Sequence, residues 1–145
     1  QEGLYKFSNL SPWYCGLINL RFKNLDKELK HRRQIAKIYK QKLSGKILND
    51  EITDLVGLST NLRFPIFVED RRDLVGYLKK NNIYVSDIWY DAPIAPRKYL
   101  SFPQFENELP NSEKISSKIL NLPTHKNVSL ENAEKICDLI NKWTA

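Results

Sequence analysis

The chain has 145 residues, of which 41% are hydrophobic and 28% charged, and its formal net charge is +6 at pH 7. This length and composition predict one globular domain with its own core and exclude disorder throughout the chain. The basic residues are spread along the sequence, apart from a run at residues 30–33, so nucleic-acid binding is not favoured.

Residue counts and patterns also argue against a metal site, a membrane span and secretion. Cys15 and Cys137 have no neighbouring Cys or His at metal-ligand spacing, so we expect no metal site and two buried free thiols in a reducing cytoplasm. No apolar run approaches the ~20 residues that span a bilayer, and no secretory signal is visible. Because the sequence contains no Met, we expect that it was cut from a longer protein.

The first third of the sequence predicts a lead-in at residues 1–10 and then one long helix. Ser11 and Pro12 form a strong helix start. Apolar residues then recur at helical spacing up to a Ser-Gly stop, and a helix over residues 12–43 would be ~48 Å long if unbroken. Its first turns carry apolar residues that we expect to be exposed and to meet another domain or chain: Trp13, Tyr14 and Leu17.

The middle of the sequence predicts a strand, a helix and a second strand. The first strand covers residues 63–68, and Pro65 places it at an edge or a bulge because proline cannot donate to a ladder. Asp70 can cap a helix over residues 71–80. The second strand is predicted over residues 83–90.

The remaining segments predict loops and two further helices. Residues 46–61 and 91–110 are expected to be loops, and a short helix is expected to start at residue 111 or 112 and to end near residue 120. Ser129 is predicted to cap the last helix. Together these elements favour an α+β fold in which flanking helices, the long N-terminal helix among them, cover a small sheet.

Residues that could carry catalysis are few. His31 lies in a basic helical run and is expected to be solvated, whereas His125 lies in the loop sequence PTHKN, a better place for a functional group. The five glycines do not form a phosphate-binding loop, and no nucleophile elbow is visible. From spacing and composition alone, the chain is an accessory domain without an active site.

Four segments, in chain order, resemble the DegT-type sugar aminotransferases. In that family a helix links the large and small domains, and residues 10–43 match its pattern at Gly16, Leu20, Leu25, Asp26, Arg32, Arg33, Ala36 and Tyr39. The family's next strand is similar to NLRFPIFVED, and its following helix and strand are similar to DLVGYLKKNNIYVSDIWY. Its closing segment is similar to KILNLPTHKNVSLENAEKICDLI. The resemblance covers nearly the whole chain.

The resemblance implies the small domain of a fold type I aminotransferase, which uses pyridoxal phosphate and an amino donor to aminate a keto sugar nucleotide. Residues 11–145 would be this C-terminal domain, which closes the active site and supports a cytoplasmic homodimer. The family's cofactor lysine lies in a large N-terminal domain that precedes the matched region. We therefore expect the fragment alone to be inactive, with no catalytic residue and no bound cofactor.

The same resemblance implies three ligand contacts. Where the family has Gly-x-Asn-x-Arg, this chain has GLYKF, so Lys6 replaces the Arg that reaches a cofactor phosphate and no Asn is in place. Tyr90 and His125 would position the substrate on the side that faces the active site. The alternative is a free-standing, non-enzymatic binding domain on the same scaffold, and the upstream gene sequence would separate the two hypotheses.

Overall fold

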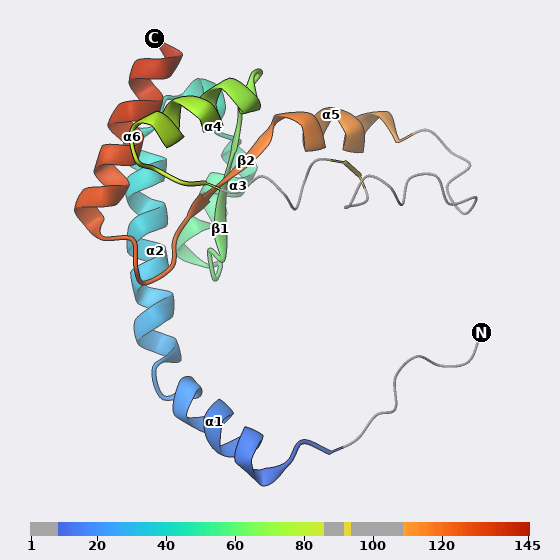
Figure 1. Cartoon of the computed structure of the whole chain (residues 1–145), viewed down its shortest axis with the longest axis vertical. Coiled ribbons are helices and arrows are strands. Elements are labelled where there is room, and N and C mark those ends of the chain that lie inside the picture. Colours follow the sequence, from blue (N-terminus) through green and yellow to red (C-terminus); the bar gives the residue numbers. More distant parts are fainter. Residues whose placement is uncertain (1–8, 86–91, 94–108) are drawn as a thin grey trace.

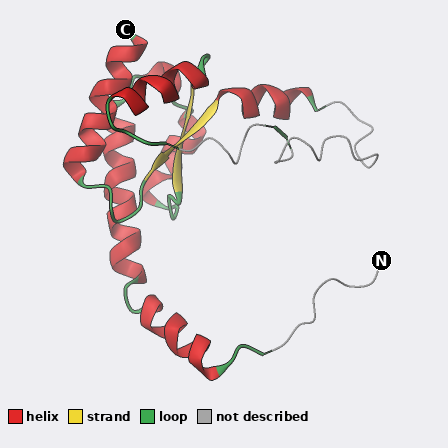
Figure 2. Ribbon diagram, in the orientation of Figure 1, coloured by secondary structure: helices red, strands yellow, loops and turns green. Residues whose placement is uncertain are grey.

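The structure, a computed structural model, describes residues 9–85, 92–93 and 109–145. Its helices gather about a pair of strands, and the first helix stands apart from them (Figures 1 and 2). In chain order the elements are α1 (Pro12–Phe22), α2 (Leu25–Lys42), the 3₁₀ turn η1 (Gly45–Ile47), α3 (Asp50–Asp54), the 3₁₀ turn η2 (Leu55–Gly57), β1 (Arg63–Phe67), α4 (Arg71–Lys80), α5 (Pro110–Lys118), β2 (Ile119–Pro123) and α6 (Leu130–Thr144).

The sheet in the described residues consists of β1 and β2, which pair antiparallel with Arg63 opposite Pro123 and Phe67 opposite Ile119. The sequence predicts a second strand over residues 83–90. Residues 83–85 form no strand, and residues 86–90 lie outside the described residues. The segment expected to be a helix end and a loop forms β2 instead, because alternate side chains of residues 119–123 reach the core.

The core lies between the sheet and the helices α2, α4 and α6. In β1 and β2 every second side chain is buried, and α6 packs along both α2 and α4. The rings of Tyr39 and Phe64 meet at 5.3 Å between centroids. These interactions confirm the predicted α+β fold. The largest fully buried side chains are Tyr39, Phe64, Ile35, Ile66, Leu74, Leu78, Leu120, Leu122, Ile140, Thr124 and Cys137.

The long N-terminal helix is broken, contrary to the prediction of one helix over residues 12–43. α1 ends at Phe22 and α2 begins at Leu25. At the break, the N–H of Asn24 donates to the carbonyl of Arg21 at 3.1 Å, which is a tighter turn than an α-helix makes. Asn24 has φ −101° and ψ 0° and leaves the helical path. Because no residue of α1 is buried, no packing holds the helix straight across this turn.

Two helix starts agree with the capping residues predicted from the sequence. The side chain of Asp70 accepts from the backbone N–H of Asp73, and that of Ser129 from the N–H of Asn132. Segments without a long apolar stripe were less predictable. Residues 46–61, expected to be a loop, contain η1, α3 and η2, and α5 covers residues 110–118 rather than 111–120.

The two cysteines differ in environment. Cys137 is fully buried in α6, and burial raises the pKa of its thiol to about 12. Cys15 is exposed on α1, so the expectation of two buried thiols is wrong for this residue. No group of His, Cys, Asp or Glu in the described part of the chain could hold a metal ion.

Candidate functional site

The loop that follows β2, residues 124–128, is held by side chains of α2. The Nε2 of His31 bonds the carbonyl oxygen of Val128 at 3.0 Å, and the hydroxyl of Tyr39 donates to the carbonyl of Pro123 at 2.9 Å. The prediction that His31 is solvated is therefore wrong, because its ring makes this hydrogen bond. Its ring ties the start of α2 to the residue before the cap of α6.

Thr124 fixes the other side of this loop. Its side chain is fully buried, and its hydroxyl lies within hydrogen-bonding distance of the carbonyl oxygens of Asn61 and Leu62. The guanidinium of Arg32 donates to the Thr124 hydroxyl at 3.1 Å and to the Leu62 carbonyl at 3.2 Å. Asn61 has a φ of 46°, in the left-handed region that Asn tolerates better than most residues. These contacts join α2, the turn before β1 and the loop after β2.

His125 is partly exposed at the centre of this loop. Its Nδ1 accepts from the backbone N–H of Asn127 at 3.3 Å, and its own carbonyl accepts from the N–H of Val128 at 2.9 Å. Burial lowers the pKa of its imidazole, and the nearby positive charges of Arg63, Arg32 and His31 lower it further. The neutral ring that accepts at Nδ1 carries its proton on Nε2, which leaves one N–H able to donate to a ligand.

A cavity of about 400 Å³ lies beside this loop, at the junction of α1 and α2. Its lining carries more positive than negative charge, with Glu28 as the one carboxylate, 4.0 Å from Lys126. Such a cavity suits an anionic or oxygen-rich ligand better than an apolar one. The lining residues are Arg21, Asn24, Lys27, Glu28, His31 and Lys126.

Of the three residues predicted to contact ligands, the structure describes His125, which does not line this cavity, although the next residue, Lys126, does. Lys6 and Tyr90 lie outside the described residues, so their positions stay predictions. Sequence reasoning missed His31 and the role of Arg32 in holding the loop. The paired arginines of the resemblance were the signal for Arg32, whereas nothing local identifies His31, whose partner is 97 residues away.

Comparison with solved structures places this fold in one class of protein. A DegT DnrJ EryC1 StrS aminotransferase from Brucella abortus matches with a TM-score of 0.67 and 23% identity, over 98% of this chain and 40% of that one. The chain therefore has the fold of part of a DegT-type aminotransferase, which is of fold type I.

Sequence comparison identifies the family. The profile of the DegT/DnrJ/EryC1/StrS aminotransferase family matches residues 5–141. The chain belongs to this family, whose members depend on pyridoxal phosphate.

Two curated relatives are transaminases of nucleotide-linked sugars. A dTDP-3-amino-3,6-dideoxy-alpha-D-galactopyranose transaminase from Aneurinibacillus thermoaerophilus is 27% identical over 98% of this chain. A dTDP-4-amino-4,6-dideoxy-D-glucose transaminase from Shigella dysenteriae is 32% identical over 83% of it. The matches span only 39% and 34% of those relatives' own lengths.

The cationic cavity does not fit a covalently bound pyridoxal phosphate. Lys27 and Lys126, the lysines of the cationic cavity, are both exposed, whereas an imine to a lysine needs a site shielded from water. The positive lining could face a phosphate oxygen but offers no enclosed amine. None of the helices in the described ranges combines the length and apolar character of a membrane span.

Proposed function

We propose that this chain is the C-terminal small domain of a pyridoxal-phosphate-dependent aminotransferase that acts on keto sugar nucleotides, with residues 11–145 as the domain. The observation that carries the proposal is the family match over residues 5–141 in a chain that spans 34–39% of the length of sugar-nucleotide transaminases. The cofactor lysine and the chemistry belong to a large N-terminal domain. The small domain formed by this chain closes the active site.

The loop of residues 124–128 would contact the substrate. His125 is the side chain best suited to this role, since its Nε2–H can donate to an oxygen of the sugar or of a phosphate. Burial first, and then the charges of Arg63, Arg32 and His31, lower the pKa of the imidazole, and the neutral ring leaves Nε2 as a donor. The two arginines also favour an anionic ligand. Tyr90 would act beside it, and Lys6 would face the cofactor phosphate of a neighbouring subunit.

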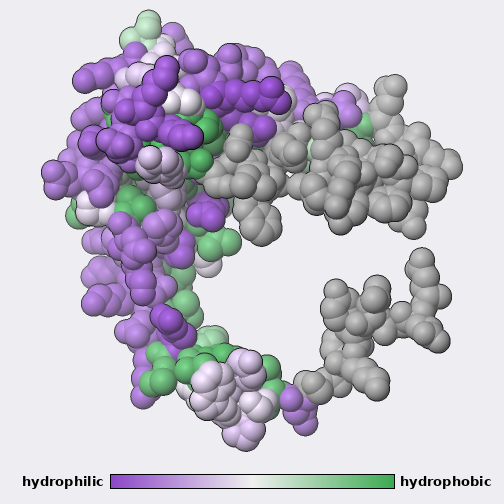
Figure 3. Space-filling view, viewed as in Figure 1, coloured by the Kyte–Doolittle hydropathy of each residue, from purple (hydrophilic) through white to green (hydrophobic). Residues whose placement is uncertain are grey.

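The apolar surface of α1 would meet the large domain and a second subunit in a homodimer. Apolar side chains surround this helix, and Figure 3 shows them as green and pale groups along it. Trp13 is 68% exposed and Tyr14 is 54% exposed, as the sequence predicted. A helix that is apolar on all sides is normally buried in a larger assembly.

Kinetics of the full-length enzyme test the role of His125. His125→Ala should raise KM more than it lowers kcat, because the residue positions substrate and does not transfer the proton. The matched variant His125→Asn retains an acceptor for the Asn127 N–H but lacks the imidazole Nε2–H. A rise of KM in both variants supports substrate positioning. A large loss of thermal stability with unchanged KM in His125→Ala would show a structural role.

The domain assignment is tested on the chain alone. We expect it to form no stoichiometric imine with pyridoxal phosphate and to have no aminotransferase activity. Mass spectrometry after borohydride reduction measures the imine, with a full-length relative as the positive control. A covalent adduct at one per chain would contradict the assignment to the small domain.

The second candidate function is a free-standing binding domain, which the positive cavity beside His31 favours. The upstream gene sequence separates the two functions. A preceding domain with the cofactor lysine supports the aminotransferase, and its absence supports the binding domain.

A further inference from the structure

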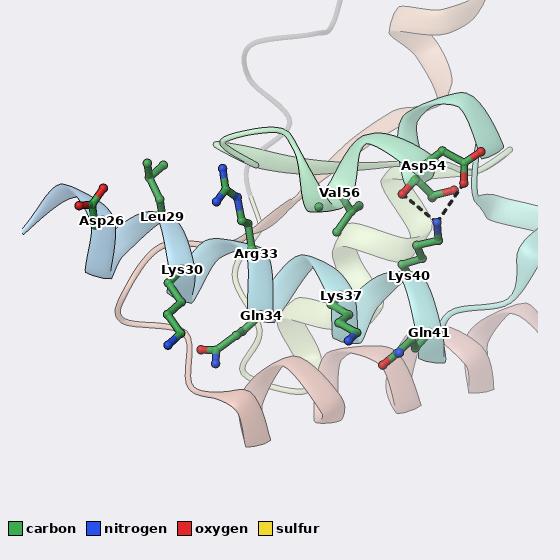
Figure 4. A pocket seen from close by; sticks show the side chains of 12 residues that line it. Asp26, Leu29, Lys30, Arg33, Gln34, Lys37, Lys40, Gln41, Asp54 and Val56 are labelled. Carbon is green, nitrogen blue, oxygen red and sulfur yellow. Dashed lines mark hydrogen bonds and ion pairs between the residues drawn. The ribbon is translucent and has the colours of Figure 1, made fainter.

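A groove of about 690 Å³ lies on a different face of α2 from His31. Side chains of α2 form one wall, and α3 with η2 forms the other (Figure 4). Its lining on α2 extends from Asp26 to Gln41, a length of ~22 Å at the rise of an α-helix. The groove is thus an elongated channel along a helix and not a closed pocket.

Four cations of α2 line the groove, and two of them are fixed by the opposite wall. Arg33 donates to the carbonyl oxygens of Ser59 and Leu58 at 3.2 and 3.4 Å. Lys40 donates to the carbonyl of Thr53 and to Asp54, both at 3.0 Å. These bonds order the two side chains before any ligand binds, which lowers the entropy cost of binding.

The other two cations, Lys30 and Lys37, have no hydrogen bond or ion pair with any described residue. Both are exposed and project to the same side of α2 (Figure 4). They are seven residues apart, which is about two helical turns or ~10 Å. Against four cations the lining has the carboxylates of Asp26 and Asp54, and Asp54 already pairs with Lys40. The groove therefore carries unmatched positive charge.

Part of the lining of the groove is apolar. Leu29 and Val56 belong to the lining. Outside the lining, Leu55 precedes Val56 in the chain and Leu58 follows η2, and these two leucines are 54% and 79% exposed. An elongated groove with an apolar wall and a row of cations complements an amphipathic helix that is acidic on its polar side.

We propose that this groove docks an acidic amphipathic helix of a partner protein. Carboxylates at positions i and i+7 of that helix would pair with Lys30 and Lys37, and leucine-like residues between them would contact Leu29 and Val56. Two observations favour this partner. The lining follows α2 for ~22 Å, which is about four turns of a docked helix. Two of the four cations in the lining have no partner among the described residues and are left to pair with carboxylates.

The test uses the full chain and a fluorescently labelled synthetic helix in which Leu and Glu recur every three or four residues. Anisotropy should show saturable binding that weakens with salt. Lys30→Glu with Lys37→Glu should weaken it at least about tenfold, and the milder pair Lys30→Gln with Lys37→Gln should weaken it less. The control pair Lys79→Glu with Lys80→Glu makes the same charge change on exposed residues of α4 and should change binding less than about twofold.

Each other outcome overturns the proposal. If the groove variant and the control variant lose the same affinity for the peptide, the attraction is non-specific. If the peptide binds equally well with Gln in place of each Glu, its carboxylates do not contribute to binding. Absence of binding at millimolar peptide would exclude the helix. Displacement of the peptide by a nucleoside diphosphate or by single-stranded DNA at lower concentration than unlabelled peptide would assign the groove to phosphate ligands. Circular dichroism of each variant verifies that it is folded.

Discussion

Thr124 shows how much one buried hydroxyl connects in this fold. The hydroxyl contacts the carbonyls of Asn61 and Leu62 and accepts from Arg32, so three parts of the chain meet at one oxygen. Replacing the hydroxyl by a methyl group of similar shape would remove the hydrogen bond to the carbonyl of Asn61, whereas Arg32 and the Leu62 carbonyl keep the bond between them. Loss of the partner of a buried carbonyl is costly inside a protein.

We therefore predict that Thr124→Val lowers the free energy of unfolding by about 1–3 kcal/mol. Urea unfolding of the chain measures this difference. The control is Thr60→Val, since Thr60 is exposed nearby and should change stability by less than ~0.5 kcal/mol. Equal effects of the two substitutions would contradict the role given to the Thr124 hydroxyl.

His125 should make stability depend on pH in one direction. Its folded-state pKa is lowered, by burial first and then by Arg63, Arg32 and His31. The unfolded chain consequently binds the proton more readily. Above the ordinary pKa of about 6.5, titration of His125 does not change the free energy of unfolding. As the pH falls below that value and through the folded-state pKa, the free energy of unfolding decreases.

Melting curves between about pH 5 and pH 8 test this expectation. His125→Asn should flatten the acid-side decrease in melting temperature, because Asn keeps an acceptor for the Asn127 N–H but does not titrate. A profile as steep as that of the unchanged chain would assign the acid sensitivity to other groups.

Elements whose signals are local could be predicted well. Asp70 and Ser129 were identified as caps because each side chain bonds a backbone N–H only three residues away. β2 could not be predicted in this way. Its five residues form a strand only because β1, far away in the sequence, pairs with them, and the same apolar run can also end a helix.

The cap of α6 provides the test at this scale. Ser129→Ala should lower the free energy of unfolding by about 1 kcal/mol, because the N–H of Asn132 loses its acceptor at the helix start. Chemical unfolding measures the change. Ser112→Ala is the control, since Ser112 is exposed in α5. If both variants lose the same stability, the cap contributes nothing measurable.

At the scale of the whole molecule, α1 extends from the body without burying any residue (Figure 1). We predict that a chain starting at Lys23 unfolds with a free energy within ~1 kcal/mol of the longer chain. It should also self-associate less, since the apolar surface is gone. Urea unfolding and light scattering measure the two effects. A collapse of stability would show that α1 packs on the body in solution.

The candidate site was predictable only in part. His125 was selected as a candidate because it lies in a loop, and its contact with a ligand stays a prediction. The break after Phe22 was missed since no Gly or Pro marks it, and the hydrogen bond of His31 was missed because Val128 is distant in the sequence. Signals that depend on tertiary partners cannot be recovered from spacing alone.

The packing of α2 on α6 has a consequence for synthesis in the cell. His31 and Ser44 each bond a residue 97 positions later, Val128 and Asn141, so α2 docks only after α6 has been translated. Until then the side of α2 that packs against α6 has no partner helix, although the rest of α2 can already contact η2 and Phe64. Contacts this distant slow folding and expose the nascent chain to aggregation. A premature stop codon before α6 would therefore leave α2 without that partner helix.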